Sequence, residues 1–590
     1  MVTQVVFAMF LATLPSLAQM QAPPSGMRVT SGAAPGYVDD VVCRTCHHEK
    51  HDSYQGVGMA RSMRRPRAQE MIEDFAHSRF FHAPSQSWYE MEWNGTVLLF
   101  RSYQLDENKK RIHVLELKVD WILGSGHRSR VYLYRTPGGE LFQLPVAWYT
   151  QEKAWGMAPG FDRPDHDGVE RRVRRECLFC HNAYPDVPAG SDAHWAPQTF
   201  PAALPEGTGC QRCHGPGARH ARTALAGGAK DEIRAAIVNP AKLPPDRRDS
   251  VCFQCHLLPA VEMIGVRRFD RLDYSFRPGE LLSDYMLHVE IEEPSMKPAD
   301  RFEINHHAYR LQQSLCYKKG GITCINCHDP HQPIDKDPRL ASVRGVCLGC
   351  HKPHEVVAGA EKPGDCTTCH MPRRRTQDVV HVIMTDHRIQ RRPPANALAP
   401  LREREPDIAD VQFLDPAHVP TGTLGNVYRA VTVLRALPAY REALAHLAQE
   451  LPKAAAPSKV PSYDLVAAEI QAGRYAEAMK IIASLPADDL RVISWRGAAH
   501  FGLGETDAAI DDLRRAVQGA PEVYEYQLTL GVALHKLGRD AAALAPLTHA
   551  VELRPTSSAA LTVRGEALAL LGRKAEAEAD RERALAMRPK

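Results

Sequence analysis

Cysteine and histidine recur in one fixed pattern through the first two thirds of this chain. Seven Cys-x-x-Cys-His motifs occur between residues 43 and 370. Two thiols about one helical turn apart can each form a thioether with a haem vinyl group, and the histidine that follows can bind the iron. Numbered in chain order, motifs 1 to 7 are Cys43/Cys46/His47, Cys177/Cys180/His181, Cys210/Cys213/His214, Cys252/Cys255/His256, Cys324/Cys327/His328, Cys347/Cys350/His351 and Cys366/Cys369/His370. The sequence therefore predicts seven covalently attached haem c groups, each with its iron bound by the motif histidine.

Zinc binding and disulfide formation are the alternatives for paired cysteines. A structural zinc site usually takes two ligand pairs and gives no reason for a histidine after every pair. Since all seven pairs are followed by histidine, haem attachment is favoured. Fourteen of the fifteen cysteines are thereby assigned, and Cys316 is left as a buried free thiol or as a redox-active one.

The second axial ligand of each iron decides between electron transfer and substrate chemistry, because only a five-coordinate haem has a vacant position. His220 and His331 follow a motif histidine so closely that they cannot reach the far face of their own haem. Either of them, if it binds iron, must therefore serve a neighbouring haem, which would interlock the haems into a chain. For His381 and His387, a solvated or structural imidazole is an equal alternative. The candidate distal ligands are Met59, His127, His220, His307, His331, His381 and His387.

Three of these candidates carry further local arguments. His127 follows Gly124-Ser125-Gly126, which lets the backbone approach a porphyrin closely. His306 and His307 would point about 100° apart on a helix, so only one of them is expected to bind iron. Met59 is either an axial thioether, which would raise the potential of its haem, or a core methionine.

Charge and targeting signals narrow the class of protein. The 590 residues carry a formal net charge of +3, so no nucleic-acid partner is indicated. An apolar run from Val5 to Ala18 predicts a signal peptide over residues 1–18. This run is short for a membrane span and is interrupted by Pro15, and no later segment reads as transmembrane. Because haem c is attached outside the cytoplasm, we expect an exported protein, in the periplasm or at the cell surface.

The organisation of the chain changes near residue 395. We expect a heptahaem cytochrome domain over 38–395, with a β-rich insert at about 86–150. Six motifs follow one another between residues 177 and 370, in a segment that cannot bury a conventional core, so stacked haems would supply it. A linker over 396–425 would then lead to a second domain over 426–590. The strands expected in the insert run over 88–102, 111–119, 130–134 and 141–146.

The second domain repeats with a period of 34 residues. Such a period, with small residues where paired helices cross and proline after each second helix, predicts tetratricopeptide repeats. The fold class is therefore mixed: a mainly helical and irregular haem-packed domain with a β-rich insert, followed by an all-α solenoid. We expect the solenoid to bind a redox partner protein or to drive self-assembly, with a purely stabilising cap as the alternative. The repeated positions are Gly497, Gly531 and Gly565; Gly504, Gly538 and Gly572; Ala509, Ala543 and Ala577; Ala516, Ala550 and Ala584; and Pro521, Pro555 and Pro589.

Several of these residues resemble a known family. The run from Cys210 to His220 with its Gly-Pro-Gly, the Cys-x-x-Cys-His-Asp-Pro-His from Cys324 to His331, and the run from Cys366 to Pro372 are similar to multihaem cytochromes related to the tetrahaem carrier that accepts electrons from hydroxylamine oxidoreductase. More closely, Gly124 to His127, Leu144 to Val146, Trp155 to Gly160 and the repeat domain resemble uncharacterised environmental bacterial cytochromes of this two-part architecture. The resemblance implies distal-ligand roles for His220 and His331. It departs near the first haem, where relatives often have histidine and this chain has Met59.

Two classes of function stay open. An electron carrier would pass electrons along packed haems between a donor and an acceptor protein. An oxidoreductase acting on nitrite, hydroxylamine or a similar small substrate would need one open haem with acid–base groups above it. The chain has no Cys-x-x-Cys-Lys motif, and its histidines outnumber the expected irons. Electron transfer is therefore favoured, no catalytic residue is assigned, and seven redox centres argue against a purely structural use of haem.

Overall fold

The structure is a computed structural model that describes residues 27–258, 265–352, 365–392, 394–437 and 440–588. The signal peptide expected over residues 1–18 lies outside these ranges, as does Pro589. Among the described residues, no helix is both long and apolar enough to cross a membrane.

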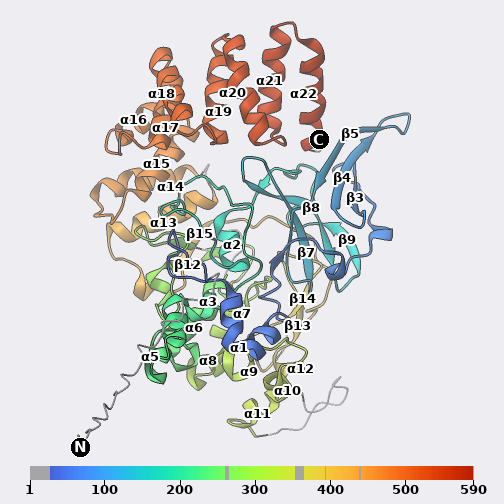
Figure 1. Cartoon of the computed structure of the whole chain (residues 1–590), viewed down its shortest axis with the longest axis vertical. Helices are drawn as coiled ribbons and strands as arrows, with labels where there is room; N and C mark the ends of the chain where they lie inside the picture. Colours follow the sequence, from blue (N-terminus) through green and yellow to red (C-terminus); the bar gives the residue numbers. More distant parts are fainter. Residues whose placement is uncertain (1–26, 259–264, 353–364, 393, 438–439, 589–590) are drawn as a thin grey trace, which may run out of the picture.

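Two antiparallel sheets form the β-containing N-terminal region (Figure 1). One sheet has the strand order β2-β3-β4-β5, and the other has β1-β6-β7-β8-β10 with β9 paired to β8. The strands are β1 (Met63–Arg64), β2 (Phe80–His82), β3 (Ser87–Trp93), β4 (Leu98–Leu105), β5 (Arg111–Lys118), β6 (Trp121–Leu123), β7 (Ser129–Arg135), β8 (Leu141–Tyr149), β9 (Ala154–Met157) and β10 (Arg171–Arg172).

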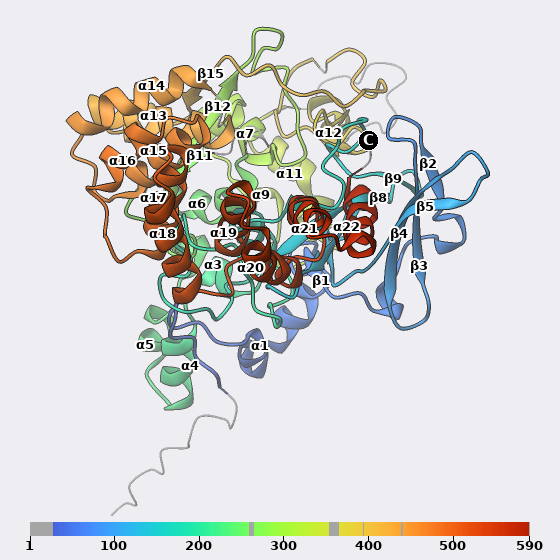
Figure 2. The ribbon, with the colours of Figure 1, turned by 90° about the horizontal axis from the view of Figure 1, so that it is seen from above.

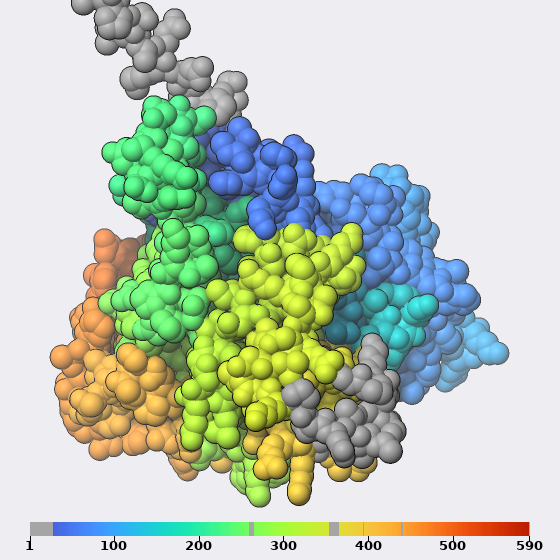
Figure 3. Space-filling view, turned by 90° about the horizontal axis from the view of Figure 1, so that it is seen from below, coloured from blue at the N-terminus to red at the C-terminus, as the bar shows by residue number. Residues whose placement is uncertain are grey.

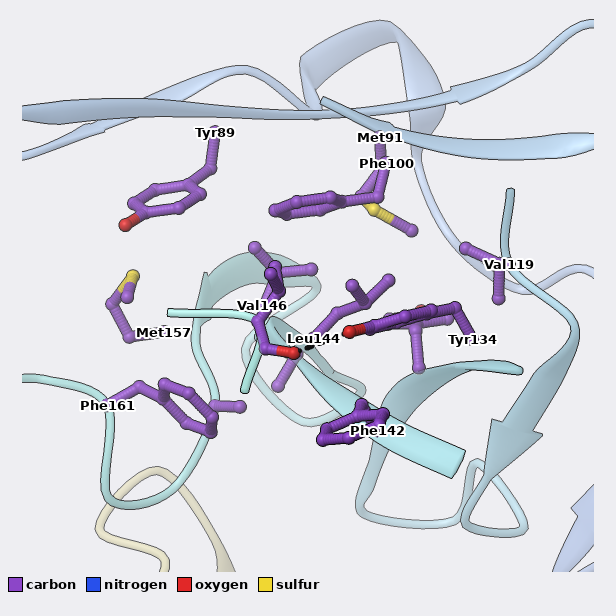
Figure 4. Packing of buried hydrophobic residues seen from close by; sticks show 14 of the residues in the cluster. Tyr89, Met91, Phe100, Val119, Tyr134, Phe142, Leu144, Val146, Met157 and Phe161 are labelled. Carbon is purple, nitrogen blue, oxygen red and sulfur yellow. Dashed lines mark hydrogen bonds between the residues drawn. The ribbon is translucent and has the colours of Figure 1, made fainter. Parts of the chain in front are cut away.

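The core of this region lies between the facing sheets. Alternate residues of β3 and β4 point inward, as the two-residue period of a strand requires. Figure 4 shows Tyr89 and Phe100 above Val146 and Leu144, which come from the opposite sheet. Burial of these side chains fixes the register of both sheets, because a one-residue slip would expose them.

The strand prediction is confirmed at three places and wrong at one. Strand β5 lies in its predicted run, and β7 and β8 cover theirs and extend beyond them, but the single strand expected over 88–102 is the hairpin of β3 and β4. The chain reverses at Asn94 and Gly95, where Gly95 has a φ of +91°. The Asn94 side chain accepts hydrogen bonds from the Thr96 and Val97 N–H groups. An Asn-Gly pair between two apolar runs is a strong hairpin signal, and it accounts for the two strands found here.

Short helices joined by loops make up the region that carries the motifs. The helices are α1 (Asp40–Tyr54), α2 (Arg175–His181), α3 (Gln211–His214), α4 (Ala218–Leu225), α5 (Lys230–Ala235), α6 (Pro245–His256), α7 (His307–Gln312), α8 (Leu315–Gly320), α9 (Cys324–Cys327), α10 (Pro338–Ala341), α11 (Val343–Leu348) and α12 (Cys366–His370). Small sheets join β11 (Gly265–Arg267), β12 (Met286–Glu292) and β15 (Asp410–Phe413), and β13 (Arg373–Arg375) with β14 (Ile383–Thr385). Because β15 pairs with β12, part of the segment expected to be a linker belongs to the fold instead.

Paired antiparallel helices form the solenoid, which confirms the predicted repeat architecture. The glycines of the repeat lie where helices cross: a Cβ on Gly531 would sit 2.6 Å from the Leu547 side chain. The helices are α13 (Thr423–Ala436), α14 (Arg441–Glu450), α15 (Val460–Gln471), α16 (Tyr475–Ile482), α17 (Leu490–Gly502), α18 (Thr506–Gly519), α19 (Tyr524–Lys536), α20 (Asp540–Leu553), α21 (Ser558–Leu570) and α22 (Lys574–Met587). Seen from above, they follow an arc over the rest of the molecule (Figure 2).

The solenoid packs on the β-containing region through the ends of its helices. The Gly138 N–H donates to the Leu553 carbonyl oxygen at 2.9 Å. Arg554 forms a two-point ion pair with Glu140, and its guanidinium lies 3.4 Å from the centroid of the Tyr524 ring. The solenoid is therefore held by buried polar contacts and is not a freely hinged appendage.

Candidate haem-binding sites

Each cysteine pair lies on about one turn of helix. In α1, α2, α6, α9 and α12 both thiols of the motif belong to the helix, and the three-residue spacing puts them on one side of it. The backbone leaves helical geometry at His47 and at His328, which lets the imidazole turn away from the helix that precedes it. All fifteen cysteines are free thiols in this structure. This arrangement suits attachment of one flat group per motif.

The motif thiols differ in exposure. Cys46, Cys177, Cys350 and Cys369 are exposed, whereas the other ten motif cysteines are partly buried. Cys46 and Cys369 lie on the solvent side of α1 and α12, and Cys350 follows the end of α11, so the surrounding chain does not cover them. Their role as attachment points stays a prediction.

Three motif histidines face a second imidazole at nearly the same separation. The ring centroids are 6.2 Å apart for His47 and His220, 6.0 Å for His214 and His331, and 6.3 Å for His328 and His387. The ring planes of these pairs differ by 15°, 21° and 31°. An iron held between two imidazole nitrogens, each about 2 Å from it, sets the centroids about 6 Å apart. The spacing therefore fits six-coordinate iron with two histidine ligands.

The fourth motif meets a tighter group of imidazoles. His307 lies 5.3 Å from His256 and 4.9 Å from His387, centroid to centroid. The neighbouring His306 is buried elsewhere, beside Tyr309 and 3.6 Å from the Glu303 carboxylate. Among the described residues, His307 faces a motif histidine, whereas His306 is the residue just before α7.

Hydrogen bonds at Nδ1 orient the candidate ligands. The Nδ1 atoms of His214, His220 and His370 lie 2.7–2.8 Å from backbone carbonyl oxygens of Val238, Ile233 and Gln390. Nδ1 of His331 lies 3.1 Å from Asp329, and Nδ1 of His387 lies 3.1 Å from the Thr385 carbonyl oxygen. A proton on Nδ1 leaves the lone pair on Nε2, which is the arrangement a metal-binding histidine needs.

Burial keeps several of these imidazoles neutral. It lowers the pKa of His387 to about 4 and also lowers the pKa of His214 and of His307. The buried Nδ1 atoms of His181 and His307 have no hydrogen-bond partner among the described residues. A buried polar atom without a partner costs free energy, so bonding to a further group would stabilise this region. Neutral imidazoles fit iron ligation through Nε2.

The backbone of Met59 is linked to motif 2 through Thr208, and His127 lies against the neighbouring Gly58. The Met59 carbonyl oxygen accepts from the Thr208 N–H, and the Thr208 hydroxyl donates to the Cys180 carbonyl oxygen at 3.2 Å. His127 lies against Gly58, where an added Cβ would be 3.5 Å from its Nδ1. The resemblance left the ligand opposite His47 open because of Met59, whereas the structure places His220 there.

The two remaining predicted residues have different settings. The ring of His381 lies 4.4 Å from that of Tyr149, and its Nδ1 is 2.9 Å from the Glu152 carboxylate. His351 is exposed in the described part of the chain, just after α11. The structure does not bring either of them against a second predicted iron ligand among the described residues.

Cysteines of different motifs lie close to one another, which the sequence did not indicate. The thiols of motifs 1 and 3, 2 and 4, 4 and 5, and 6 and 7 are near enough for one to shift the pKa of the other. The pairs are Cys43 with Cys210, Cys180 with Cys255, Cys252 with Cys324, and Cys347 with Cys366. Attachment points this close require the attached groups to be neighbours.

Asp40 and Gln211 hold motif 1 against motif 3, and sequence reasoning missed both. The Asp40 carboxylate accepts from the Cys210 N–H at 2.8 Å and from the Gln211 side chain at 3.2 Å. Gln211 also accepts from the N–H groups of Val38 and Gly217. Burial raises the pKa of Asp40. Figure 3 shows the blue segment with α1 lying against the green segments on the face away from the solenoid. A variable position inside Cys-x-x-Cys-His carries no signal for such a role.

Comparison with known proteins adds one family match. A family model described as a doubled CXXCH motif matches residues 317–356, which contain motifs 5 and 6. This match supports covalent haem c binding and suggests a multihaem c-type cytochrome. No curated protein matches the chain.

Solved structures resemble part of the chain. A MamA structure (AMB-1) is 22% identical over 27% of this chain and 94% of its own, with a TM-score of 0.24. YrrB, a tetratricopeptide-repeat protein with an unusual peptide-binding site, is 18% identical over 29% and 88%, with a TM-score of 0.23. TTC0263 from Thermus thermophilus is 23% identical over 28% and 91%, with a TM-score of 0.25. The repeat architecture of this chain rests on its own helix pairs.

Proposed function

We propose that this chain is an exported c-type cytochrome that binds seven haems and carries electrons along them between partner proteins. The observation that carries the proposal is the facing of motif histidines by second imidazoles at 6.0–6.3 Å. Iron bound on both faces by imidazole has no position for substrate and is suited to electron transfer.

The axial ligands follow from the imidazole pairs. His220 serves the haem of motif 1, His331 that of motif 3 and His387 that of motif 5, with His307 serving motif 4. The haems of motifs 2, 6 and 7 draw on the other candidates, which are Met59, His127 and His381. Haem supplies a reversible one-electron change at iron when bound, and the protein orients the imidazoles and limits access of water.

The haems form one connected series. The distal ligand for motif 1 comes from the segment after motif 3, the one for motif 3 from the segment after motif 5, and the one for motif 5 from the segment after motif 7. Motif 2 lies near motif 4, and motif 4 near motif 5, since their thiols shift each other's pKa. Because each haem is held by parts of the chain that also hold its neighbour, electrons can pass through the whole set.

The repeat domain is the docking or assembly platform of this cytochrome. Helix ends of the solenoid pack against the β-containing region, through Leu553 and Arg554 among others. Other faces of the arc are therefore left for a protein partner. The donor and the acceptor are redox proteins of the periplasm or the cell surface.

Haem content and spin state test this function. The protein is produced in a host that exports it and attaches haem c, and iron and haem are quantified per chain. Seven haems with low-spin ferric spectra support the carrier. A stoichiometric high-spin haem that responds to nitrite or hydroxylamine would instead support an oxidoreductase with one open haem.

A further inference from the structure

Asp464 belongs to the solenoid but faces the motif-bearing region. It lies on α15 with 4% of its surface exposed. Its two carboxylate oxygens accept from Arg435 at 3.1 and 2.7 Å, and one of them lies 3.5 Å from Nε2 of His194. A buried carboxylate with these two partners is ionised and fixed in orientation.

His194 connects Asp464 to Arg267 of β11, in the motif-bearing region. Its Nδ1 accepts from the Arg267 guanidinium at 3.2 Å, so its proton is on Nε2 and points to Asp464. Next to it, the Trp195 ring packs edge-on against Trp495 of α17 at 5.4 Å. The segment is therefore clamped to the solenoid by one polar and one aromatic contact.

Buried ion pairs then lead from Arg267 to the first residue of α2. Arg267 pairs with Asp273, which pairs with Arg175 at 2.6 Å. Arg175 also donates to the carbonyl oxygens of Ala193, Ala196 and Pro197, on both sides of His194. Arg267, Asp273 and Arg175 are each at most 6% exposed.

Helix α2 carries Cys177, Cys180 and His181 of motif 2. A second tie holds the strand just before it, because Arg172 of β10 pairs with Glu525 of the solenoid at 2.5 Å. Figure 1 shows α2 nearer the solenoid than the helices that carry the other motifs. The start of α2 is thus fixed to the solenoid from two directions.

We propose that Asp464 is a positioning residue for the haem of motif 2, and that the solenoid sets the environment of this one haem through His194, Arg267, Asp273 and Arg175. The proposal rests on the proposed function, since it takes motif 2 to carry a redox-active haem. When a partner protein docks on the solenoid, the haem whose reduction potential changes is therefore that of motif 2.

Two substitutions with one matched control test this inference. Asp464→Asn removes the buried negative charge, and His194→Gln breaks the link to Arg267 while leaving the Arg435 pair in place. Asp580→Asn is the control, because Asp580 is equally buried and takes a two-point bond from Arg564 within the solenoid. His181→Met, which changes one iron ligand, identifies the spectrum of the haem of motif 2.

The readouts are haem content, paramagnetic resonance and a redox titration of each full-length protein. With seven haems retained, Asp464→Asn should raise the midpoint potential of the haem identified by His181→Met, because loss of a buried negative charge disfavours ferric iron. His194→Gln should alter the resonance signal of that same haem, and Asp580→Asn should change none. Unaltered signals and potentials in both test variants, or equal shifts at all haems, would overturn the inference. If Asp464→Asn does not fold, the result for His194→Gln alone tests the inference. A wild-type protein with fewer than seven haems would count against the proposed function instead.

Discussion

The imidazole rings of His214 and His331 face each other at 6.0 Å with their planes 21° apart, although 117 positions separate the two residues in the chain (331 − 214). Each ring has its Nδ1 hydrogen-bonded, to the Val238 carbonyl oxygen and to Asp329 respectively, so both Nε2 atoms are left as ligands. This relationship makes the haem of motif 3 depend on a residue that follows motif 5.

Replacing His331 by alanine should therefore open one iron and no other. Loss of the distal imidazole leaves a five-coordinate, high-spin ferric haem, while both thioethers of motif 3 stay intact. Paramagnetic resonance should show one high-spin haem per chain, with unchanged haem content. His418→Ala is the control, since His418 is exposed and paired with Asp415. A fully low-spin spectrum for His331→Ala would remove this residue from the ligand set.

Acid should destabilise the β-containing region through His166. This side chain is 2% exposed and lies 3.0 Å from the Tyr89 hydroxyl; burial, with the nearby His82 and Arg171, lowers its pKa to about 4. In the unfolded chain His166 takes up a proton near pH 6.5, whereas in the folded protein it does so only near pH 4. The free energy of unfolding therefore falls as the pH falls from about 6.5 to about 4.

The expected loss from this one group is about 3 kcal/mol across that range. Urea unfolding of the β-containing region, followed by tryptophan fluorescence between pH 7 and 4, measures it. His166→Gln should flatten the dependence relative to wild type. An equally steep curve in the variant would assign the acid sensitivity to other groups.

The crossing of α19 and α20 should not tolerate a side chain at Gly531. A Cβ there would meet Leu547 at 2.6 Å, so Gly531→Val should cost about 1–3 kcal/mol of solenoid stability. Ala569→Val, at an exposed position of α21, should change stability by less than about 0.5 kcal/mol. Chemical unfolding monitored by circular dichroism compares them. Equal stability of the two variants would mean that the helices at Gly531 are packed more loosely than the structure has them.

Arg554 should be needed to keep the solenoid on the β-containing region. Without Arg554, the buried Glu140 carboxylate keeps only its ion pair with Arg172, at 2.9 Å. The Tyr524 ring loses its cation–π contact. We expect Arg554→Ala to cost about 3 kcal/mol and to speed proteolysis between the two regions. Arg573→Ala removes only an exposed pair with Glu576 and should be nearly neutral. Matching digestion rates for the two variants would contradict a closely docked solenoid.

Local patterns predicted much of the fold. The 34-residue period identified the solenoid, because small residues at helix crossings such as Gly531 leave a direct mark on the sequence. The strand at 141–146 was visible as an apolar run. In contrast, β15 was read as linker, since a four-residue strand that pairs with the distant β12 has no period of its own.

The candidate site divides in the same way. Motif histidines and cysteines are set by a contiguous pattern, so their identity follows from the sequence. The imidazoles that face them do not follow from such a pattern. The placement of His220 opposite His47 and of His387 opposite His328 depends on how distant segments fold together. His387 was as good a candidate for a solvated imidazole until its burial and its neighbours were known. Asp40 and Gln211 gave no signal at all, because their role is to hold one motif against another.

The proposed carrier needs seven haems whose irons are each bound by protein ligands on both faces. Low-temperature paramagnetic resonance of the oxidised full-length protein, with spin quantified against iron and haem per chain, measures this. We expect seven haems per chain, all low-spin, with no change on adding nitrite or hydroxylamine. One high-spin haem per chain that binds either molecule would contradict it and identify an enzyme.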